Sequence, residues 1–442
     1  MMLLPELGKL ADVTAVVDQQ EVRPAPPCPI ITIDEFRRRR AEFDVAVCQI
    51  GNNIHHEFVW DEARAHPAVV VLHELVLHHL VTEVTLARGD AEQFVTLLRE
   101  SDGVAGEAFA RGRAAGLHLE TGNFLFPASA AIASAARALI VHNEWARTRL
   151  WESGVRTPVR VIDHPFDRLS IGDQKDGAGR RIRDQHGFPA GSTIVGMFGF
   201  ITEPKRPQIV FESFSRALRI DENLRLLVVG EPAPNIDLPG LARDFGISDD
   251  LWSSTGWTTD QQFDEALLGV DRVVSLRYPS AGESSGAIAR VFAAGKPLAV
   301  TDYAQFAELP SAIVVKIPLG DFEVEGLVQF MTALFDLEAI EEQQQRWIEV
   351  QGNPASVARR YLEVLEESAE PVETGLDRVP CTHHSGLGVM PSVSVTSFRA
   401  EQTGSVVRIK VALFNDGTTT IRSHKWGEPS YRLIVKLMNE GS

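Results

Sequence analysis

Short runs of β-branched and apolar residues alternate with longer amphipathic stretches along most of the chain. This alternation is typical of repeated strand–helix units, in which parallel strands pair in one sheet and helices cover its faces. It therefore predicts an α/β protein. The predicted strands of the first half are residues 13–18, 43–50, 69–73, 138–142 and 159–162, and those of the second half are residues 193–199, 224–230, 270–276, 298–302 and 313–317.

A polar, glycine-containing segment separates the two sets of units, and its composition is typical of an exposed interdomain linker. We predict two Rossmann-like domains that face each other across a cleft, residues 1–166 and 191–370, joined by a linker at residues 167–190. Later the pattern changes to alternating strands at residues 392–398, 406–414 and 431–437. This change predicts a β-rich appendage over residues 379–442, which is either incomplete or packed on the main body.

The chain of 442 residues carries a formal net charge of −17. Such a charge repels nucleic acid, which is therefore not an expected partner. The three cysteines, Cys28, Cys48 and Cys381, lie far apart and in no metal-ligand spacing. No stretch has the pattern of a transmembrane segment, and the first residues lack the pattern of a signal peptide. We expect a cytoplasmic protein, and a peripheral position at the inner face of the membrane stays open.

The stretch R-Y-P-S-A-G-E-S-S-G at residues 277–286 lies between a predicted buried strand and the start of a predicted helix. Small residues at a helix start leave backbone N–H groups and the positive end of the helix dipole available to an anion such as a diphosphate. Glu283 precedes these donors, and its carboxylate suits hydrogen bonds from sugar hydroxyls. The alternative role of Glu283 is to cap the helix.

A second strand end, at residues 199–206, also leads into a loop and a helix. Lys205 or Arg206 could neutralise the same diphosphate, because both loops follow strands that end at one edge of a parallel sheet. Two basic residues at a helix start oppose the helix dipole, which favours a bound anion there. The alternative is a solvated lysine near a helix start.

Several ordered motifs of the second half resemble the retaining nucleotide-sugar glycosyltransferases of family four, which have the GT-B fold. The family pattern comprises G-x-[LI]-x-x-x-K, a strand ending in V-G, a G-[WF]-V-like strand, P-x-x-x-E-x-x-G and A-x-G-x-P. Its counterparts in this chain are residues 199–205, 228–230, 256–258, 279–286 and 293–297.

By this resemblance, Lys205 contacts the donor diphosphate, Glu283 contacts the donor sugar, and the loop with Trp257 flanks the base. The donor-binding residues are then Gly199, Lys205, Arg206, Trp257, Thr258, Glu283, Ser284, Ser285 and Gly286. Two positions depart from the family pattern. Phe200 stands where the family usually has an arginine, and Arg290-Val291 occupy the region of a second glutamate that holds the ribose.

Polar residues also follow two strands of the first half, in the stretches Q-I-G-N-N-I-H-H and V-V-V-L-H-E-L-V-L-H-H. The histidines near Glu74 invite a metal-site interpretation. However, His78 and His79 are adjacent on a predicted helix, so their side chains point about 100 degrees apart. We therefore expect no metal site, and we expect these two histidines to be packed or exposed to solvent.

Both stretches are similar to segments of a family-four subgroup. This similarity implies that His73 hydrogen-bonds the transferring sugar. It also implies that Asn52, Asn53 and His56 shape the acceptor side. By its place at another strand end, His142 is a further candidate for the acceptor side, and its role stays open.

The first residues depart from the same family. Its members begin with a strand and a glycine-rich loop before their first helix, whereas residues 3–10 here resemble that helix and residues 11–18 resemble the second strand. The comparison predicts that the first strand is absent from this sequence.

These features predict a metal-independent enzyme that transfers a hexosyl-type group, with retention, from a UDP- or GDP-linked sugar to a hydroxyl of a saccharide, lipid-linked glycan or metabolite. No cofactor is expected beyond this co-substrate. Lys205, Glu283 and His73 would act by positioning and charge stabilisation. Two alternatives stay open: a non-catalytic nucleotide-sugar or glycan-binding protein on the same fold, and a nucleotide-sugar epimerase.

Overall fold

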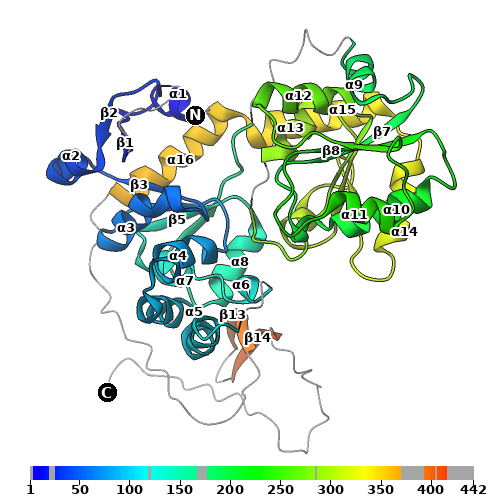
Figure 1. Cartoon of the computed structure of the whole chain (residues 1–442). Coiled ribbons are helices and arrows are strands. Elements are labelled where there is room, and N and C mark those ends of the chain that lie inside the picture. Colours follow the sequence, from blue (N-terminus) through cyan, green and yellow to red (C-terminus); the bar gives the residue numbers. More distant parts are fainter. Residues whose placement is uncertain are drawn as a thin grey trace, which may run out of the picture. The chain divides into compact units, whose positions relative to one another are not determined.

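The structure is a computed structural model that describes residues 3–18, 25–117, 121–166, 177–283, 286–369, 393–403 and 406–415 (Figure 1). Its contacts divide the chain into two compact units, Met1–Val372 and Glu373–Ser442. Among the described residues, the first unit contains a four-stranded and a six-stranded parallel sheet with their helices and a small two-stranded parallel sheet, and the second unit contains one pair of strands. Each unit is described by itself.

The sheet of the first half has four parallel strands in the order β3-β4-β5-β6. Their bounds are β3 Val47–Ile50, β4 Val69–Leu72, β5 Ala138–Val141 and β6 Val159–Val161. Every residue of β4 and β5 is buried. Strands that are covered on both faces read as continuous apolar runs, which explains why V-V-V-L and A-L-I-V form the centre of this sheet.

The helices of the first half pack mainly against one face of this sheet, around Leu72, Leu80 and Leu139. Their bounds are α3 Glu57–Ala65, α4 His78–Val84, α5 Ala91–Ala114, α6 Gly122–Leu125, α7 Ala130–Ala135 and α8 Glu144–Glu152. The long α5 is interrupted at Gly103, where φ is +67°. Glycine tolerates this left-handed conformation because it has no Cβ.

The chain before β3 differs from the prediction. It forms α1 (Leu3–Leu7), β1 (Ala15–Val17), β2 (Ile30–Thr32) and α2 (Ile33–Arg38). Strand β1 pairs with β2 in a separate two-stranded parallel sheet, so the prediction that residues 11–18 form a strand of the main sheet is wrong. All three residues of β1 are only partly buried, and a strand inside a parallel sheet needs two covered faces.

The sheet of the second half has six parallel strands in the order β12-β11-β10-β7-β8-β9. Their bounds are β7 Thr193–Phe198, β8 Leu224–Val229, β9 Trp252–Ser254, β10 Arg272–Ser275, β11 Leu298–Thr301 and β12 Val315–Ile317. The chain runs from β7 outward to β9 and then returns to the other side of β7 with β10. The order of the strands therefore reverses between β7 and β10.

Helices cover both faces of this sheet (Figure 1). One face carries α10 (Pro207–Ala217), α11 (Leu238–Asp244) and α14 (Glu323–Thr332), and the other carries α12 (Asp260–Gly269), α13 (Gly286–Ala294) and α15 (Leu337–Trp347). Two buried apolar clusters, one on each face, fill the space between helices and sheet. The two faces and the strand reversal are those of a doubly wound α/β domain.

The segment predicted as a linker differs from its prediction in its second part. Residues Ala178–His186 form helix α9, which packs against α12 through buried Ala178 and Ile182. Ala178 and Ile182 supply the buried apolar face of this helix, and its other residues are mostly polar. This composition explains why the segment resembled a linker. The residues 167–176 lie outside the described part of the chain.

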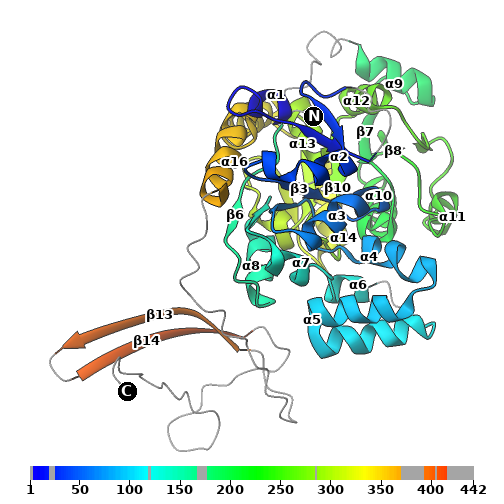
Figure 2. The same ribbon diagram turned by 90° about the vertical axis from the view of Figure 1, so that its left-hand side faces the viewer.

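The last helix of the first unit, α16 (Pro354–Ala369), returns from the second half and packs on the first sheet. Its Tyr361 lies in one apolar cluster with Val69, Val71 and Ile140 of β4 and β5. Figure 2 shows α16 beside α1, with which it is in contact. The second half thus contributes a core helix to the first half.

The second unit contains the antiparallel pair β13 (Val393–Thr403) and β14 (Val406–Asn415), with a register shift between Val395 and Ser397. These strands coincide with the first two strands predicted for the β-rich appendage. The third predicted strand, at residues 431–437, lies outside the described residues.

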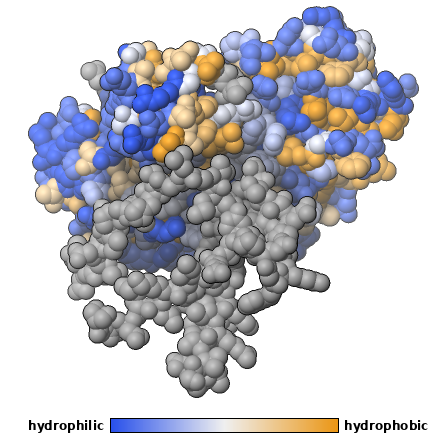
Figure 3. All heavy atoms as spheres, turned by 90° about the horizontal axis from the view of Figure 1, so that it is seen from below, coloured by the Kyte–Doolittle hydropathy of each residue, from blue (hydrophilic) through white to orange (hydrophobic). Residues whose placement is uncertain are grey.

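Among the described residues, no helix is long and apolar enough to cross a membrane. Figure 3 shows hydrophilic and hydrophobic residues interspersed over the visible part of the lower face. Two exposed aromatic side chains, Phe200 and Trp257, follow strands of the second sheet; 56% of Phe200 and 72% of Trp257 is accessible.

We expect Tyr361→Ala to lower the free energy of unfolding by about 3–5 kcal/mol, because it leaves a cavity where α16 covers β4 and β5. Urea unfolding followed by circular dichroism measures this change. The exposed Glu366→Ala on the same helix is the matched control, and its effect should stay within about 0.5 kcal/mol. Equal effects of the two variants would contradict a core role for α16.

Candidate functional site

The polar residues of interest gather where strand order reverses in the second sheet. The loop after β7 carries Lys205, and the loop after β10 carries Arg277 and Glu283. Because β7 and β10 are paired in parallel, these two loops leave the same edge of the sheet in opposite directions. Ligands of open α/β sheets bind in the crevice formed at such a point.

Lys205 is held inside the protein at the end of a short 3-10 helix, η4 (Glu203–Lys205). Its ammonium donates a hydrogen bond to the carbonyl oxygen of Phe198 at 2.5 Å and lies over Gly199, where a Cβ would come within 2.7 Å of Nζ. Burial and, second, the positive charge of Arg277 lower the pKa of Lys205 to about 6. An anion at this position would restore its charge.

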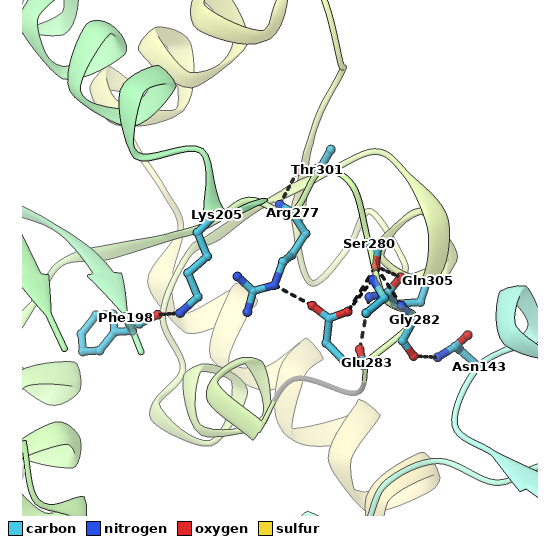
Figure 4. Close-up of polar contacts among 10 residues, drawn as sticks. Asn143, Phe198, Lys205, Arg277, Ser280, Gly282, Glu283, Thr301 and Gln305 are labelled. Carbon is cyan, nitrogen blue, oxygen red and sulfur yellow. Dashed lines mark hydrogen bonds and ion pairs between the residues drawn. The ribbon is translucent and has the colours of Figure 1, made fainter. Parts of the chain in front are cut away.

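Arg277 and Glu283 form an ion pair beside this lysine (Figure 4). Nε of Arg277 donates to Oε1 of Glu283 at 2.6 Å, and the other carboxylate oxygen accepts from the backbone N–H of Ala281 at 3.0 Å. The backbone N–H of Arg277 donates to the Thr301 hydroxyl at 2.9 Å. These bonds fix the carboxylate of Glu283 at the start of the segment that leads into α13.

The loop with Glu283 also touches the first half of the chain. The backbone N–H of Leu75 donates to the carbonyl oxygen of Ala281 at 2.7 Å, and the amide of Asn143 donates to that of Gly282 at 3.0 Å. Nearby, the Glu308 carboxylate accepts the first backbone N–H groups of α8, a favourable position for a negative charge. The loop that carries Glu283 is therefore held by residues of both halves.

Three histidines that follow strands of the first sheet pack together near this contact; the rings of His73 and His142 are stacked, whereas His164 meets His142 edge-on. The ring centroids of His73 and His142 are 5.2 Å apart, and those of His142 and His164 are 5.4 Å apart. Burial lowers the pKa of His73 to about 4 and that of His142 to about 3, so both rings are neutral near pH 7.

Their hydrogen bonds determine which nitrogen of His73 carries the proton. Nδ1 of His142 lies 2.8 Å from the carbonyl oxygen of Ile162, so it must be the donor, and Nε2 of the same ring is then an acceptor. Nδ1 of His73 lies 3.2 Å from that Nε2 and is therefore the protonated nitrogen of His73. Nε2 of His73 keeps its lone pair and can accept a hydrogen bond from a hydroxyl.

The asparagine pair after β3 shapes the neighbouring loop. The backbone N–H of Asn52 donates to Glu74 at 3.0 Å, and its side-chain oxygen accepts the backbone N–H of Leu80 at 2.9 Å. Asn53 caps the short helix η2 (Ile54–His56). The ring of His56 folds back on the strand, where Nδ1 lies 2.9 Å from the carbonyl oxygen of Gln49. Asn52 and His56 thus order the loop through their own bonds.

One cavity of about 460 Å³ is lined by residues of both halves. His142, His164 and Asn143 come from the first half, and Glu283 and Trp347 come from the second. Aromatic rings line one side, since Trp347 lies 5.6 Å from Phe166 between ring centroids. The predicted acceptor-side residue His142 and the predicted sugar-binding residue Glu283 therefore share one space.

Other predicted donor residues lie apart from this cluster or outside the described chain. Arg206 forms a two-pronged ion pair with buried Glu323, with contacts of 2.5 and 2.6 Å, and this pair uses its charge within the protein. Trp257 and Thr258 follow β9, which is separated from β10 by the two strands β7 and β8. Ser284 and Ser285 lie outside the described residues, and Gly286 begins α13.

The histidines for which we expected no metal are separated. His78 is fully buried between the rings of Phe94 and Phe109, whereas His79 is exposed and lies 3.9 Å from Glu83. The packed environment predicted for His78 is confirmed. Among the described residues, no group of three or more His, Cys, Asp or Glu side chains is arranged to hold a metal ion.

Arg277, Glu74 and Glu308 were missed as site residues by the sequence analysis. Arg277 and Glu74 each stand at a strand end that was recognised, and this position was the available signal. Burial raises the pKa of Glu74 to about 7, and the negative charge of Glu283 adds to that rise. Nothing near Glu308 in the sequence indicates that it caps a helix more than 150 residues earlier.

No model of a known protein family matches the chain, and no curated protein sequence matches it. Among solved structures, its fold is similar to that of HepE from Anabaena in complex with UDP, with a TM-score of 0.50 and 14% identity over 74% of this chain and 100% of that one. It is also similar to sucrose-phosphate synthase from Thermosynechococcus elongatus, with a TM-score of 0.53 and 14% identity over 83% of this chain and 91% of that one. The chain thus has the GT-B fold, and the predicted fold class, two Rossmann-like domains, is confirmed.

We expect Glu74→Gln to stabilise the protein by about 1–3 kcal/mol at about pH 8, and to have little effect at about pH 4. The carboxyl of Glu74 has an ordinary pKa of 4.5, which burial raises to about 7 in the native protein. The native protein therefore binds this proton more tightly than the unfolded chain does, and wild-type stability falls as pH rises between these two values. Glutamine keeps an oxygen for the N–H of Asn52. Urea unfolding across this pH range measures the difference, and a difference independent of pH would contradict the raised pKa.

Proposed function

We propose that this chain is a retaining, family-four-type glycosyltransferase that transfers a sugar from a UDP- or GDP-linked donor. The observation that carries the proposal is the pair of basic side chains, buried Lys205 and partly buried Arg277, next to the Glu283 carboxylate at the strand reversal. Two basic side chains with one carboxylate suit a ligand that is strongly anionic at one end and rich in hydroxyls at the other. A nucleotide diphosphate sugar has this chemistry.

In the proposed reaction, the bond between the anomeric carbon and the diphosphate oxygen breaks, and its electron pair leaves with the diphosphate. Lys205 and the backbone N–H groups at the start of α13 stabilise this developing charge. The acceptor oxygen bonds to the anomeric carbon on the face from which the diphosphate departs, and the acceptor proton passes to a phosphate oxygen. Glu283 accepts hydrogen bonds from the sugar hydroxyls and keeps the ring oriented.

Residues of the first half would serve the acceptor side. The lone pair on Nε2 of His73 suits a hydroxyl of the transferring sugar. The cavity lined by His142, Trp347 and Glu283 offers both aromatic faces and polar groups, which is the combination that saccharide rings use. These features support a hydroxyl acceptor on a saccharide, a lipid-linked glycan or a metabolite.

The comparisons support the nucleotide part of the proposal, since the structure of HepE contains UDP. Lys205 and Arg277 support transfer without a metal, because with an anion bound both side chains carry a positive charge and can provide the charge stabilisation that a divalent cation provides elsewhere.

A second candidate is a nucleotide-sugar-binding protein without turnover. Phe200 adds no charge to the site. The region expected to hold the ribose with a glutamate carries Arg290 instead, and this arginine is bonded to Asp260 and Asp264 of α12 at 2.8 and 3.3 Å. Release of free sugar from the bound donor separates the two candidates. Binding of the nucleotide with neither hydrolysis nor transfer would favour this second one.

We expect UDP or GDP, and their sugars, to raise the melting temperature of the wild-type protein in a thermal-shift panel that also contains ADP. Lys205→Ala should abolish the shift for all of them, because it removes a buried phosphate-binding cation. Glu283→Gln should retain the shift with the free diphosphate and lose the additional shift from the sugar. The exposed Glu366→Ala is the control. No shift with any nucleotide would overturn the proposed function.

We also expect nucleotide binding to take up close to one proton at about pH 8, where the diphosphate is fully ionised. Lys205, with its pKa lowered to about 6 in the free protein, is then mostly neutral, and a bound anion raises that pKa. Affinity should therefore fall as pH rises above about 8. Calorimetry in two buffers of different ionisation enthalpy measures the uptake, and Lys205→Gln should remove it. Equal heats in both buffers would contradict the role of Lys205.

A further inference from the structure

Arg277 lies between the two residues that the proposed function uses. Figure 4 shows its guanidinium between the Lys205 ammonium and the Glu283 carboxylate. The backbone N–H of Tyr278 donates to the carbonyl oxygen of Pro204 at 2.8 Å, so the loop of Arg277 is tied directly to the loop of Lys205. The bond from the backbone N–H of Arg277 to Thr301 fixes the start of its side chain.

The guanidinium of Arg277 is only partly used by the protein. Nε is bonded to Glu283, but Nη1 is buried and has no hydrogen-bond partner among the described residues. Only 16% of the side chain is accessible. A buried N–H of a charged group without a partner is costly, which is why such groups in native proteins usually face a ligand or another charge.

The charges around Arg277 favour an anionic ligand. When Lys205 is protonated, the two basic side chains and the one carboxylate leave an excess of one positive charge at this site, which a bound anion would balance. The other carboxylate that interacts with this group is that of Glu74, whose pKa is raised to about 7. Arg277 also lowers the pKa of Lys205, which shows that the two basic groups repel each other. An anion that contacts both would remove this repulsion.

The forked geometry of its guanidinium allows Arg277 to bind two anionic groups at once. A guanidinium presents its N–H groups in a rigid fork, so Nε can keep Glu283 while the Nη atoms bond to phosphate oxygens. Lysine offers a single point charge and cannot hold both partners in a fixed geometry.

We propose that Arg277 binds the diphosphate of the donor through its Nη atoms while Nε holds Glu283. Arg277 thereby connects the phosphate end of the site to the carboxylate that orients the sugar. This inference rests on the proposed function and adds a residue to it. The competing role is purely structural, with Arg277 serving only to hold Glu283 in place.

Affinities for UDP, UMP, GDP, GMP, ADP and AMP, and for the sugars of the three diphosphates, measured by calorimetry on the full chain, distinguish these roles. Wild-type protein should prefer the diphosphate of its nucleotide to the monophosphate. Arg277→Gln should weaken diphosphate binding by about 10–100-fold and monophosphate binding much less, because it removes charge-assisted hydrogen bonds to phosphate. The exposed Arg243→Gln, which changes net charge equally, is the matched control and should leave both affinities unchanged.

Each outcome has a separate meaning. If wild-type protein binds none of these nucleotides, the proposed function fails. If it binds a diphosphate and Arg277→Gln keeps the full preference over the monophosphate, only the inference fails. Arg277→Gln could also keep its preference for the diphosphate over the monophosphate and lose only the difference in affinity between the free diphosphate and the nucleotide sugar. That result would show the purely structural role and would also overturn the inference.

A second variant guards against a folding defect in Arg277→Gln, which the melting temperature of the free protein reveals. Arg277→Lys keeps the positive charge but loses the fork. It should retain part of the diphosphate preference and lose the additional affinity that the sugar provides. Full retention of both properties by Arg277→Lys would contradict a two-sided role for the guanidinium.

Discussion

The parallel pairing of β10 with β7 is the constraint on which the candidate site depends. Because the strand order reverses there, the loops that follow β7 and β10 diverge and leave room at the edge of the sheet. The same pairing brings Arg277 close enough to Lys205 to lower the pKa of the lysine. Without this pairing, two basic side chains more than 70 positions apart in the sequence would not meet at one site.

The contact between the two halves depends in turn on the loop after β10. Leu75 and Asn143 bind the carbonyl oxygens of Ala281 and Gly282, so the loop that holds Glu283 is also part of the interface. Gly282 has φ of +74°, and a Cβ there would come within 2.7 Å of Trp145. Glycine is required by both the backbone conformation and the close approach. The position of the Glu283 carboxylate and the contact between the halves are thus linked through the backbone of residues 281–283.

Sequence patterns predicted the larger elements well. The apolar runs of β4, β5, β8 and β11 are buried along their whole length, and such runs are readable because both faces of a parallel sheet are covered. Elements with weaker patterns were misread. Strand β1 is partly exposed and joins a separate sheet, and α9 has a mostly polar surface inside the predicted linker.

The residues of the candidate site were likewise predicted only in part. Lys205, Glu283 and His73 could be named because each stands in a loop after a recognisable strand, where parallel sheets carry their functional residues. Arg206 could be named for the same reason, yet its charge is used by Glu323, 117 residues later. Sequence position alone gives no information on which partner a charged side chain finds.

The sequence by itself determined the α/β class, the two-domain division and the strand ends at which functional residues gather, because these follow from local hydrophobic periodicity. Only the tertiary structure decided that Arg277 lies between Lys205 and Glu283, that His73 keeps its lone pair on Nε2, and that Glu308 caps α8. These features arise from strand order and from packing between distant segments. They depend on distances and burial in space, which no local pattern of residues records.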